Sequence, residues 1–457
     1  MRYWKLTIYL LAFCLALAFS HWAKAVYPVA GRRKFLLPGI LFALPLFLVV
    51  LFFCAKPAYG ATEFVATVMQ SGGDYSTLNT WENAIDCDLT VATTKVVAGA
   101  LTRGSFADGV AVTQTASGAA AVMLHDTATQ ILLISITGTP NATNTWYPTA
   151  DGSDATNAFT PTDAGDSAIA VAQIDGAWTS ADATAVTIDG WTTNSSNYIK
   201  IYTTTAARHD GKWNEGKYRL ELDPGWSGTV LTSTTANYIT ITGIQISNTG
   251  GGSSSLDLSL GGTNALFDRG ILAASPGGGA WLQSTSEIRN TIVYDASYDG
   301  IVLAGNGSLA RNCTVGYNGR YGIDAYYVSV TATNCLCRNN TGGDFIMGGS
   351  YIFTVTYSAS GDATADDWDG AGNKISQTFS MVAPTGSPRD FHLNSDDAGA
   401  RNYGIDLSAT FTDDIDGETR PTGAGTWDIG ADEYVPLDVK DVRIRGNVKF
   451  RGDVKFR

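Results

Sequence analysis

Charge is scarce in this chain, and positive charge is the scarcer sign. Only 16% of the residues are Asp, Glu, Lys or Arg, and the formal net charge is −13. Binding to phosphate backbones needs a basic face, so this balance argues against nucleic acid as a partner. Apolar residues at helical spacing are also missing from the repetitive part of the chain, and the 50 glycines are plentiful. Together these features favour an extracellular all-β protein over a helical enzyme or a disordered chain.

Cysteine is too rare for a disulfide framework. Of the six cysteines, Cys14 and Cys54 lie in apolar segments near the start, and Cys87 has no obvious partner. Cys313 and Cys335 are 22 residues apart. The repeat described next makes them stacked neighbours, either as a disulfide or as part of a buried ladder of thiols.

What the chain does contain is a repeat between residues 264 and 360. Its most regular column is Asp268, Asn290, Asn312 and Asn334, spaced 22 residues apart, and Gly278, Gly300 and Gly322 keep the same period. The intervening runs are short, rich in β-forming residues and broken by Gly and Asn. One such unit cannot bury its own apolar face, so successive units must stack. The repeat predicts a parallel β-solenoid with coils about 4.8 Å apart, in which this column forms a structural ladder.

The Asn column and the coil length resemble the right-handed parallel β-helix of the pectate-lyase superfamily, in which turn Asn residues stack and hydrogen-bond along the helix. Asn suits such a turn because it tolerates left-handed backbone geometry and both donates and accepts. We therefore predict an all-β fold: a right-handed parallel β-helix of about 22 residues per coil, with an N-terminal helical cap and an inserted small β-subdomain.

Residues 1–60 have the features of an export leader with two apolar segments. Each segment follows basic residues and ends in small residues, and we expect cleavage near Gly60. The alternative is a two-span membrane anchor. On the export reading, the protein is secreted or held at the cell surface, and membrane contact involves only the leader or the C-terminal tail.

Residues 61–95 are predicted to cap the solenoid, with a strand followed by a short helix. Ser76 can cap this helix, and Leu78, Trp81 and Ile85 fall on one face of it. The segment resembles the N-terminal cap of pectinesterase-like β-helices. Residues 96–165 alternate like strands without the repeat, which indicates an inserted β-subdomain, or alternatively two irregular coils. The parallel β-helix itself is assigned to residues 166–385.

Residues 386–436 contain Asp-Ile-Asp-Gly at 414–417, Arg-Pro at 420–421 and Trp-Asp-Ile-Gly-Ala-Asp-Glu at 427–433. This run resembles the C-terminal end of many uncharacterised secreted bacterial β-helix proteins with anchoring tails, and similar β-helix proteins occur in phage. It predicts a cap on the last coil. Residues 437–457 form a basic hexapeptide repeat, which suits a small β-meander acting as an anchoring tag or strand donor, or else a solvated tail.

Catalytic residues are not assigned by these patterns. A polysaccharide lyase would need carboxylates in register for Ca²⁺ beside a basic residue, yet Asp299 is followed in its column by Tyr321 and Gly343. A glycosidase needs a carboxylate pair across a groove; Asp295, Asp299 and Asp324 are available, but the sequence does not place them. His209 and His392 are isolated in the sequence.

Aromatic residues are dense in the coils and are the best candidates for binding. Exposed rings on a flat β-surface can stack on sugars, although aromatic residues also favour strands in general. The predicted ligand-binding residues are Trp281, Tyr294, Tyr298, Asp299, Tyr317, Arg320 and Tyr321, with Tyr326 and Tyr327 nearby.

An acidic loop supplies candidate metal ligands. Asp362, Asp366, Asp367 and Asp369 suit a structural Ca²⁺ site, although their spacing does not match an EF-hand loop and a solvated loop is the alternative. No other cofactor is expected.

The sequence therefore predicts an exported, non-catalytic protein that binds polysaccharide or cell-surface glycan, or mediates adhesion. One rival is a polysaccharide lyase or glycoside hydrolase on the same fold. Another is a phage-tail or adhesin-like structural protein, which would allow a homo-oligomer.

Overall fold

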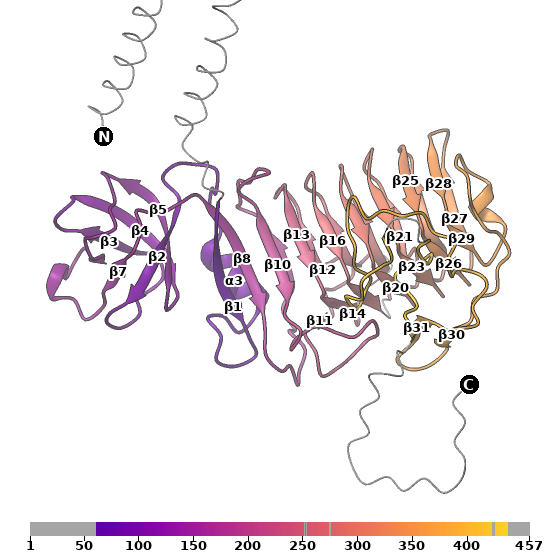
Figure 1. The fold of residues 1–457 in the computed structure, drawn as a ribbon, viewed down its shortest axis with the longest axis horizontal. Coiled ribbons are helices and arrows are strands. Elements are labelled where there is room, and N and C mark those ends of the chain that lie inside the picture. The colour runs from indigo at the N-terminus through magenta and orange to yellow at the C-terminus, as the bar shows by residue number, and fades with distance from the viewer. Residues whose placement is uncertain (1–60, 251, 253, 274–275, 423–425, 437–457) are drawn as a thin grey trace, which may run out of the picture. The chain divides into compact units, whose positions relative to one another are not determined.

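The computed structural model describes residues 61–250, 252, 254–273, 276–422 and 426–436 (Figure 1). These residues belong to one compact unit. The predicted export leader, its cleavage position and the basic tail lie outside the described residues. In the part that is described, no helix is both long and apolar enough to cross a membrane.

The unit is built on three parallel sheets that the chain visits in turn (Figure 1). Sheet 1 contains β1 (Thr62–Val68), β8 (Ala168–Ile174), β10 (Ile199–Thr203), β13 (Ile239–Thr242), β16 (Leu266–Asp268), β19 (Glu287–Arg289), β22 (Leu309–Arg311), β25 (Val330–Thr333) and β28 (Phe353–Thr356). Sheet 2 contains β11 (Arg219–Leu222), β14 (Gln245–Asn248), β17 (Ile271–Ala273), β20 (Ile292–Tyr294), β23 (Thr314–Gly316), β26 (Leu336–Arg338) and β29 (Ala359–Ser360). Sheet 3 contains β9 (Val186–Ile188), β12 (Thr229–Ser233), β15 (Leu256–Leu260), β18 (Gly278–Leu282), β21 (Ile301–Leu303), β24 (Tyr321–Tyr326) and β27 (Gly343–Gly348). Six complete coils, from β10 to β27, each contribute one strand to every sheet.

The register of the sheets follows the sequence repeat. Ile292 pairs with Thr314 and Thr314 with Leu336, each 22 residues further on. Inside the solenoid, Ala280, Ile301 and Ile323 form one such column, and their side chains are buried. The predicted parallel β-solenoid is confirmed, because like positions of successive coils become neighbours across the sheets.

The Asn column lies at a turn in left-handed backbone geometry. Asn290, Asn312 and Asn334 have φ of 46°, 47° and 54°, a region that Asn tolerates better than most residues. Asn290 Nδ2 donates to Asp268 Oδ1 at 3.1 Å, and Asn334 Nδ2 donates to Asn312 Oδ1 at 3.2 Å. Asn312 Nδ2 donates instead to the carbonyl oxygens of residues 428 and 430, at 3.3 and 3.1 Å. The ladder therefore joins the coils and also binds the C-terminal segment.

The cysteines of the coils are buried free thiols. Cys313, Cys335 and Cys337 have no exposed surface, and Cys87 is also buried and unpaired in a disulfide sense. Burial raises the pKa of the Cys313 thiol well above its usual value. Of the two alternatives for Cys313 and Cys335, the structure has the buried ladder.

The N-terminal helix α3 (Leu78–Ile85) begins one residue later than the predicted cap allows. Its N-cap is Thr77, not Ser76: Thr80 N donates to Thr77 Oγ1 at 3.2 Å, and Thr77 N donates to Thr80 Oγ1 at 3.3 Å. This reciprocal pair satisfies two backbone donors at the helix start. Leu78, Trp81 and Ile85 are fully buried, as their spacing predicts.

Residues 95–161 form a separate antiparallel sheet in the strand order β6-β3-β4-β5-β2-β7. The elements are β2 (Lys95–Leu101), β3 (Val110–Gln114), β4 (Ala119–Asp126), β5 (Gln130–Thr137), β6 (Tyr147–Pro148), the 3₁₀ turn η1 (Gly152–Asp154) and β7 (Phe159–Pro161). This sheet has its own apolar cluster around Trp146 and Phe159. The Gln130 side chain donates to Glu63 O at 2.8 Å and accepts from Val65 N at 3.3 Å, so the sheet is tied to strand β1.

The C-terminal segment differs from the prediction. Residues 386–436 were expected to cap the last coil, but they run along the outer face of sheet 2, together with β30 (Met381–Ala383) and β31 (Asp390–Leu393) (Figure 1). The reason is that sheet 2 strands such as Ile292–Tyr294 carry apolar side chains on both faces, and the outer set needs cover. The end of the solenoid is instead covered by residues 361–375, which include the 3₁₀ turn η2 (Thr364–Asp366) and bridge to β28 and β29.

Candidate functional site

The outward face of sheet 3 gathers most of the predicted binding residues. Trp281, Val302 and Asp324 form one outward column on β18, β21 and β24. Beside this column, Asp299 immediately precedes β21 in the adjoining column, and Tyr321 begins β24. The name "sheet 3 face" is used below for the following set: Trp281, Tyr298, Asp299, Arg320, Tyr321, Asp324 and Tyr326.

A charged pair is fixed within the sheet 3 face. Arg320 grips both carboxylate oxygens of Asp299, with Nε 2.7 Å from Oδ1 and Nη2 in contact with Oδ2. Tyr321 N also donates to Asp299 Oδ1, at 3.2 Å. A two-pronged pair of this kind holds both side chains in one orientation. The guanidinium remains accessible, because the Arg320 side chain is 47% exposed.

Asp324 is a second carboxyl group beside this pair. It is only 5% exposed. Burial first, and then the nearby charge of Asp299, raise the pKa of Asp324 to about 6. The sheet 3 face therefore combines a fixed ion pair with a carboxyl that holds its proton into the mildly acidic range.

Aromatic rings complete the sheet 3 face. The ring centres of Trp281 and Tyr326 are 5.2 Å apart, and those of Tyr326 and Tyr327 are 4.9 Å apart. The Arg320 guanidinium lies 5.0 Å from the centre of the Tyr321 ring. Tyr298 and Tyr326 are exposed. These rings present apolar faces with polar tips to solvent, which is the character expected of a sugar-binding surface.

Two of the predicted binding residues lie elsewhere and are covered. Tyr294 is 5% exposed, with its ring centre 5.4 Å from that of Phe391. Tyr317 lies 6.2 Å from the same Phe391 ring, and the Arg389 guanidinium stands 3.9 Å from its centre. Burial raises the pKa of Tyr294 above its usual value. In this structure both residues pack under the C-terminal segment and are separated from the sheet 3 face.

A groove forms where the C-terminal segment meets sheet 2. Its volume is about 480 Å³, and Trp213, Glu215, Glu221, Asp295 and Arg389 are among its lining residues. Arg389 pairs with Asp295 at 2.7 Å, and Arg219 pairs with Glu221 at 2.7 Å. The volume suits a small ligand. Sequence reasoning missed this groove because its walls come from residues 212–221 and 386–389, which no repeat relates.

The predicted calcium loop has a structural role in the described chain. Asp362 accepts from Asp344 N at 2.9 Å through Oδ2 and from Thr364 N at 2.9 Å through Oδ1. Asp366, Asp367 and Asp369 are exposed. Among the described residues, groups of three ligating side chains within 4.8 Å occur at other positions. Calcium binding by the loop stays a prediction.

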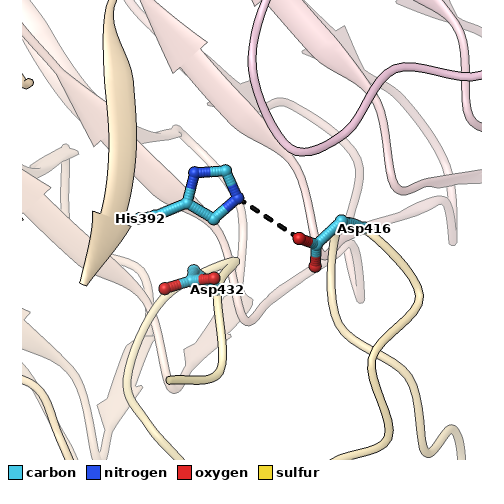
Figure 2. Close-up of side chains that lie close together, drawn as sticks. All are labelled: His392, Asp416 and Asp432. Carbon is cyan, nitrogen blue, oxygen red and sulfur yellow. Dashed lines mark hydrogen bonds and ion pairs between the residues drawn. The ribbon is translucent and has the colours of Figure 1, made fainter. Parts of the chain in front are cut away.

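Those groups involve the two histidines' neighbourhood in the C-terminal segment. One is His392, Asp416 and Asp432, shown in Figure 2, and the other is Asp414, Asp416 and Glu418. His392 is thus isolated only in the sequence. Its residues are 24 and 16 positions apart along the chain, so no motif spacing marks them. The acidic residues of the Asp-Ile-Asp-Gly and Trp-Asp-Ile-Gly-Ala-Asp-Glu runs were the available signal.

His209 is a structural turn residue in this fold. It is buried, its Nε2 lies 3.0 Å from Arg269 O, and its Nδ1 accepts from Gly211 N at 3.2 Å. Burial lowers the pKa of His209 to about 4. A neutral imidazole satisfies both contacts, because one ring nitrogen donates and the other accepts.

Comparison with known proteins places the coils in a described class. A family model for the right handed beta helix region matches residues 277–360. No curated protein matches the chain. Among solved structures, the crystal structure of pectate lyase Pel9A matches with 13% identity and a TM-score of 0.35, covering 58% of this chain and 88% of that one. With its three parallel sheets and the family match to its coils, this chain is a right-handed parallel β-helix protein.

Proposed function

We propose that the protein is exported and binds a glycan through the sheet 3 face, without cleaving it. The observation that carries the proposal is that Trp281, Tyr298, Asp299, Arg320 and Tyr321 meet on one face that the C-terminal segment leaves open. The remaining predicted residues, Tyr294 and Tyr317, are covered.

The chemistry of the sheet 3 face supports a carbohydrate ligand. Sugar rings offer apolar C–H faces that stack on Trp and Tyr, and hydroxyls that hydrogen-bond to charged side chains. The Arg320–Asp299 pair is already oriented by its own hydrogen bonds, so little side-chain freedom is lost on binding. Rings recur on successive coils, which suits a polymer better than a small molecule.

A second candidate is cleavage of the same glycan at Asp324. The specific observation in its favour is the pKa of about 6 that burial and Asp299 give this carboxyl. A carboxyl that keeps its proton can act as a general acid beside a charged carboxylate. Asp324→Asn separates the two candidates: on the catalytic reading it abolishes product while binding persists, and on the binding reading wild type releases no product at all.

The test is a glycan array followed by affinity measurements on each glycan that binds. We expect Trp281→Ala and Arg320→Ala to weaken binding at least tenfold, because each removes a contact of about 1–3 kcal/mol. Trp213→Ala is the matched control, since Trp213 lines the groove beside sheet 2. Circular dichroism of each variant checks folding.

Two results would overturn the proposal. One is an array on which no glycan binds the folded wild-type protein. The other is binding that Trp213→Ala abolishes and Trp281→Ala leaves intact, which would move the site to the groove. New reducing ends released by wild type would replace the binding function with the catalytic one. Export is tested separately, by N-terminal sequencing of protein recovered from the medium and cell surface.

A further inference from the structure

We propose that His392, Asp416 and Asp432 form a binding site for a zinc-class divalent cation that joins three parts of the C-terminal segment. This inference is independent of glycan binding, because the site lies beside sheet 2 and shares no residue with the sheet 3 face.

The three side chains converge from different places in the chain, as Figure 2 shows. His392 belongs to β31, Asp416 to the Asp-Ile-Asp-Gly turn, and Asp432 to the run that ends the described chain. One ligating atom from each lies within 4.8 Å of the others, and His392 Nε2 is 3.3 Å from Asp416 Oδ2. One imidazole and two carboxylates are a donor set that zinc accepts.

The imidazole is held in the orientation that a metal ligand needs. His392 Nδ1 lies 2.6 Å from Asp390 Oδ1, and a carboxylate can only accept, so Nδ1 carries a proton. This contact directs Nε2 toward Asp416 and Asp432. A carboxylate behind the histidine is the usual outer partner of a metal-binding imidazole, because it fixes the ring and raises its basicity.

The carboxylates facing His392 are incompletely satisfied by the protein. Asp416 Oδ1 is buried and has no hydrogen-bond partner among the described residues. Asp432 is 5% exposed, and its Oδ2 accepts from Leu393 N at 2.6 Å. A buried carboxylate oxygen without a partner is costly, and a bound cation removes that cost.

Nearby cations are engaged with other acids. Arg420 pairs with Glu433 at 2.9 Å, and Arg269 pairs with Asp413 at 3.1 Å. Asp414, with its side chain buried, adds a further carboxyl next to Asp416. The surroundings therefore carry more carboxyl groups than positive charge, which favours a divalent ion over water.

An ion can also reach the site. The side chains of His392 and Asp416 are 23% and 22% exposed. Access of this kind, with one side open to water, leaves room for a solvent ligand in addition to the three protein ligands.

The test is calorimetric titration of ZnCl₂ into the folded, chelator-treated full-length protein. We expect one Zn²⁺ per chain with micromolar or tighter affinity, and a higher melting temperature with zinc than without. His392→Gln and Asp432→Asn should each weaken binding at least tenfold. Glu418→Gln, which touches only the neighbouring acidic group, and His125→Gln, in the antiparallel sheet, are the controls and should bind as wild type does.

Zinc X-ray absorption gives a second readout, with one nitrogen and several oxygen neighbours expected. Absence of binding, or binding that His392→Gln does not change, would overturn the proposal in favour of a protonated His392 that bridges Asp390 and Asp416 without metal. Loss of binding in Glu418→Gln with retention in Asp432→Asn would also overturn it, because the ion would then sit at the Asp414 group. Denaturation curves without zinc show whether each variant is folded before titration.

Discussion

Sheets 2 and 3 are made by the same coils, yet their outer faces have opposite fates. The outer side chains of sheet 2, such as Ile271, Ile292 and Leu336, are buried under the C-terminal segment. Those of sheet 3 include Trp281, Asp324 and the exposed Tyr326. The difference lies in the outward residues alone, because the inward columns of both sheets are apolar and buried. A solenoid can therefore dedicate one side to holding its own chain and leave another for a partner.

The largest effect that would break this comparison is loss of the buried arginine under the cover of sheet 2. Arg420 is fully buried and donates to Glu433 Oε2 at 2.9 Å and to Ala431 O at 2.8 Å. We expect Arg420→Ala to lower the free energy of unfolding by about 3–5 kcal/mol, because Glu433 is left buried without its counterion. Urea unfolding measures this. Arg320→Ala, on the open face, is the control and should cost about 1 kcal/mol or less; equal losses would refute the contrast.

Next in size is the aromatic contact between cover and coils. Phe391 is 2% exposed and packs on Tyr294 and Tyr317. Phe391→Ala should destabilise the protein by about 3 kcal/mol through lost burial and a cavity. It should also make Tyr294 accessible to quenchers in fluorescence measurements. A variant with normal stability and a shielded Tyr294 would show that the cover does not depend on this contact.

On the open side, the pH dependence of stability should report Asp324. Its pKa of about 6 in the folded protein exceeds the usual 3.8, so the folded state binds the proton more tightly than the unfolded state does. The resulting stabilisation is present below about pH 4 and is lost as pH rises to about 6, by an amount of about 2 kcal/mol. Asp324→Asn removes this term. Its stability relative to wild type should therefore rise between pH 4 and pH 7 in denaturation curves, and a constant difference would contradict the assignment.

The smallest effect on stability is expected at the exposed ring of the sheet 3 face. Tyr326 is 43% exposed, so Tyr326→Ala should change the free energy of unfolding by less than about 0.5 kcal/mol. On the proposed function it should nevertheless weaken glycan binding about fivefold, since the ring contacts Trp281. Melting curves and the glycan titration on the same sample separate the two readouts; unchanged binding would remove Tyr326 from the site.

The coils could be predicted from the sequence because their contacts repeat. Each residue of the Asn column meets a neighbour one period away, and that period is visible in the letters. The burial of Cys313 and Cys335 follows from the same columns. Local capping was predictable only to within one residue: Ser76 and Thr77 are both good caps, and the Thr80 hydroxyl decides between them.

The path of the C-terminal segment could not be predicted from the same kind of pattern. Its contacts, such as Arg269 with Asp413, join residues 144 positions apart and occur once. For the same reason Tyr294 and Tyr298 looked equivalent in the sequence. They stand on either side of a turn, and only a distant phenylalanine, Phe391, decides which of them is covered. The His392 cluster was missed because its members share no spacing.

The return of the chain along sheet 2 also changes how the molecule must be assembled. A bare solenoid can add coils one after another, each stabilised by the coil before it. Here the segment near residues 390–433 contacts residues as early as Lys212 and as late as Asn334. During synthesis the early coils must therefore keep the apolar side of sheet 2 in water until the last part of the chain emerges. Once that part has docked, unfolding of any single coil requires the belt to be released, so fraying from either end is converted into all-or-none opening.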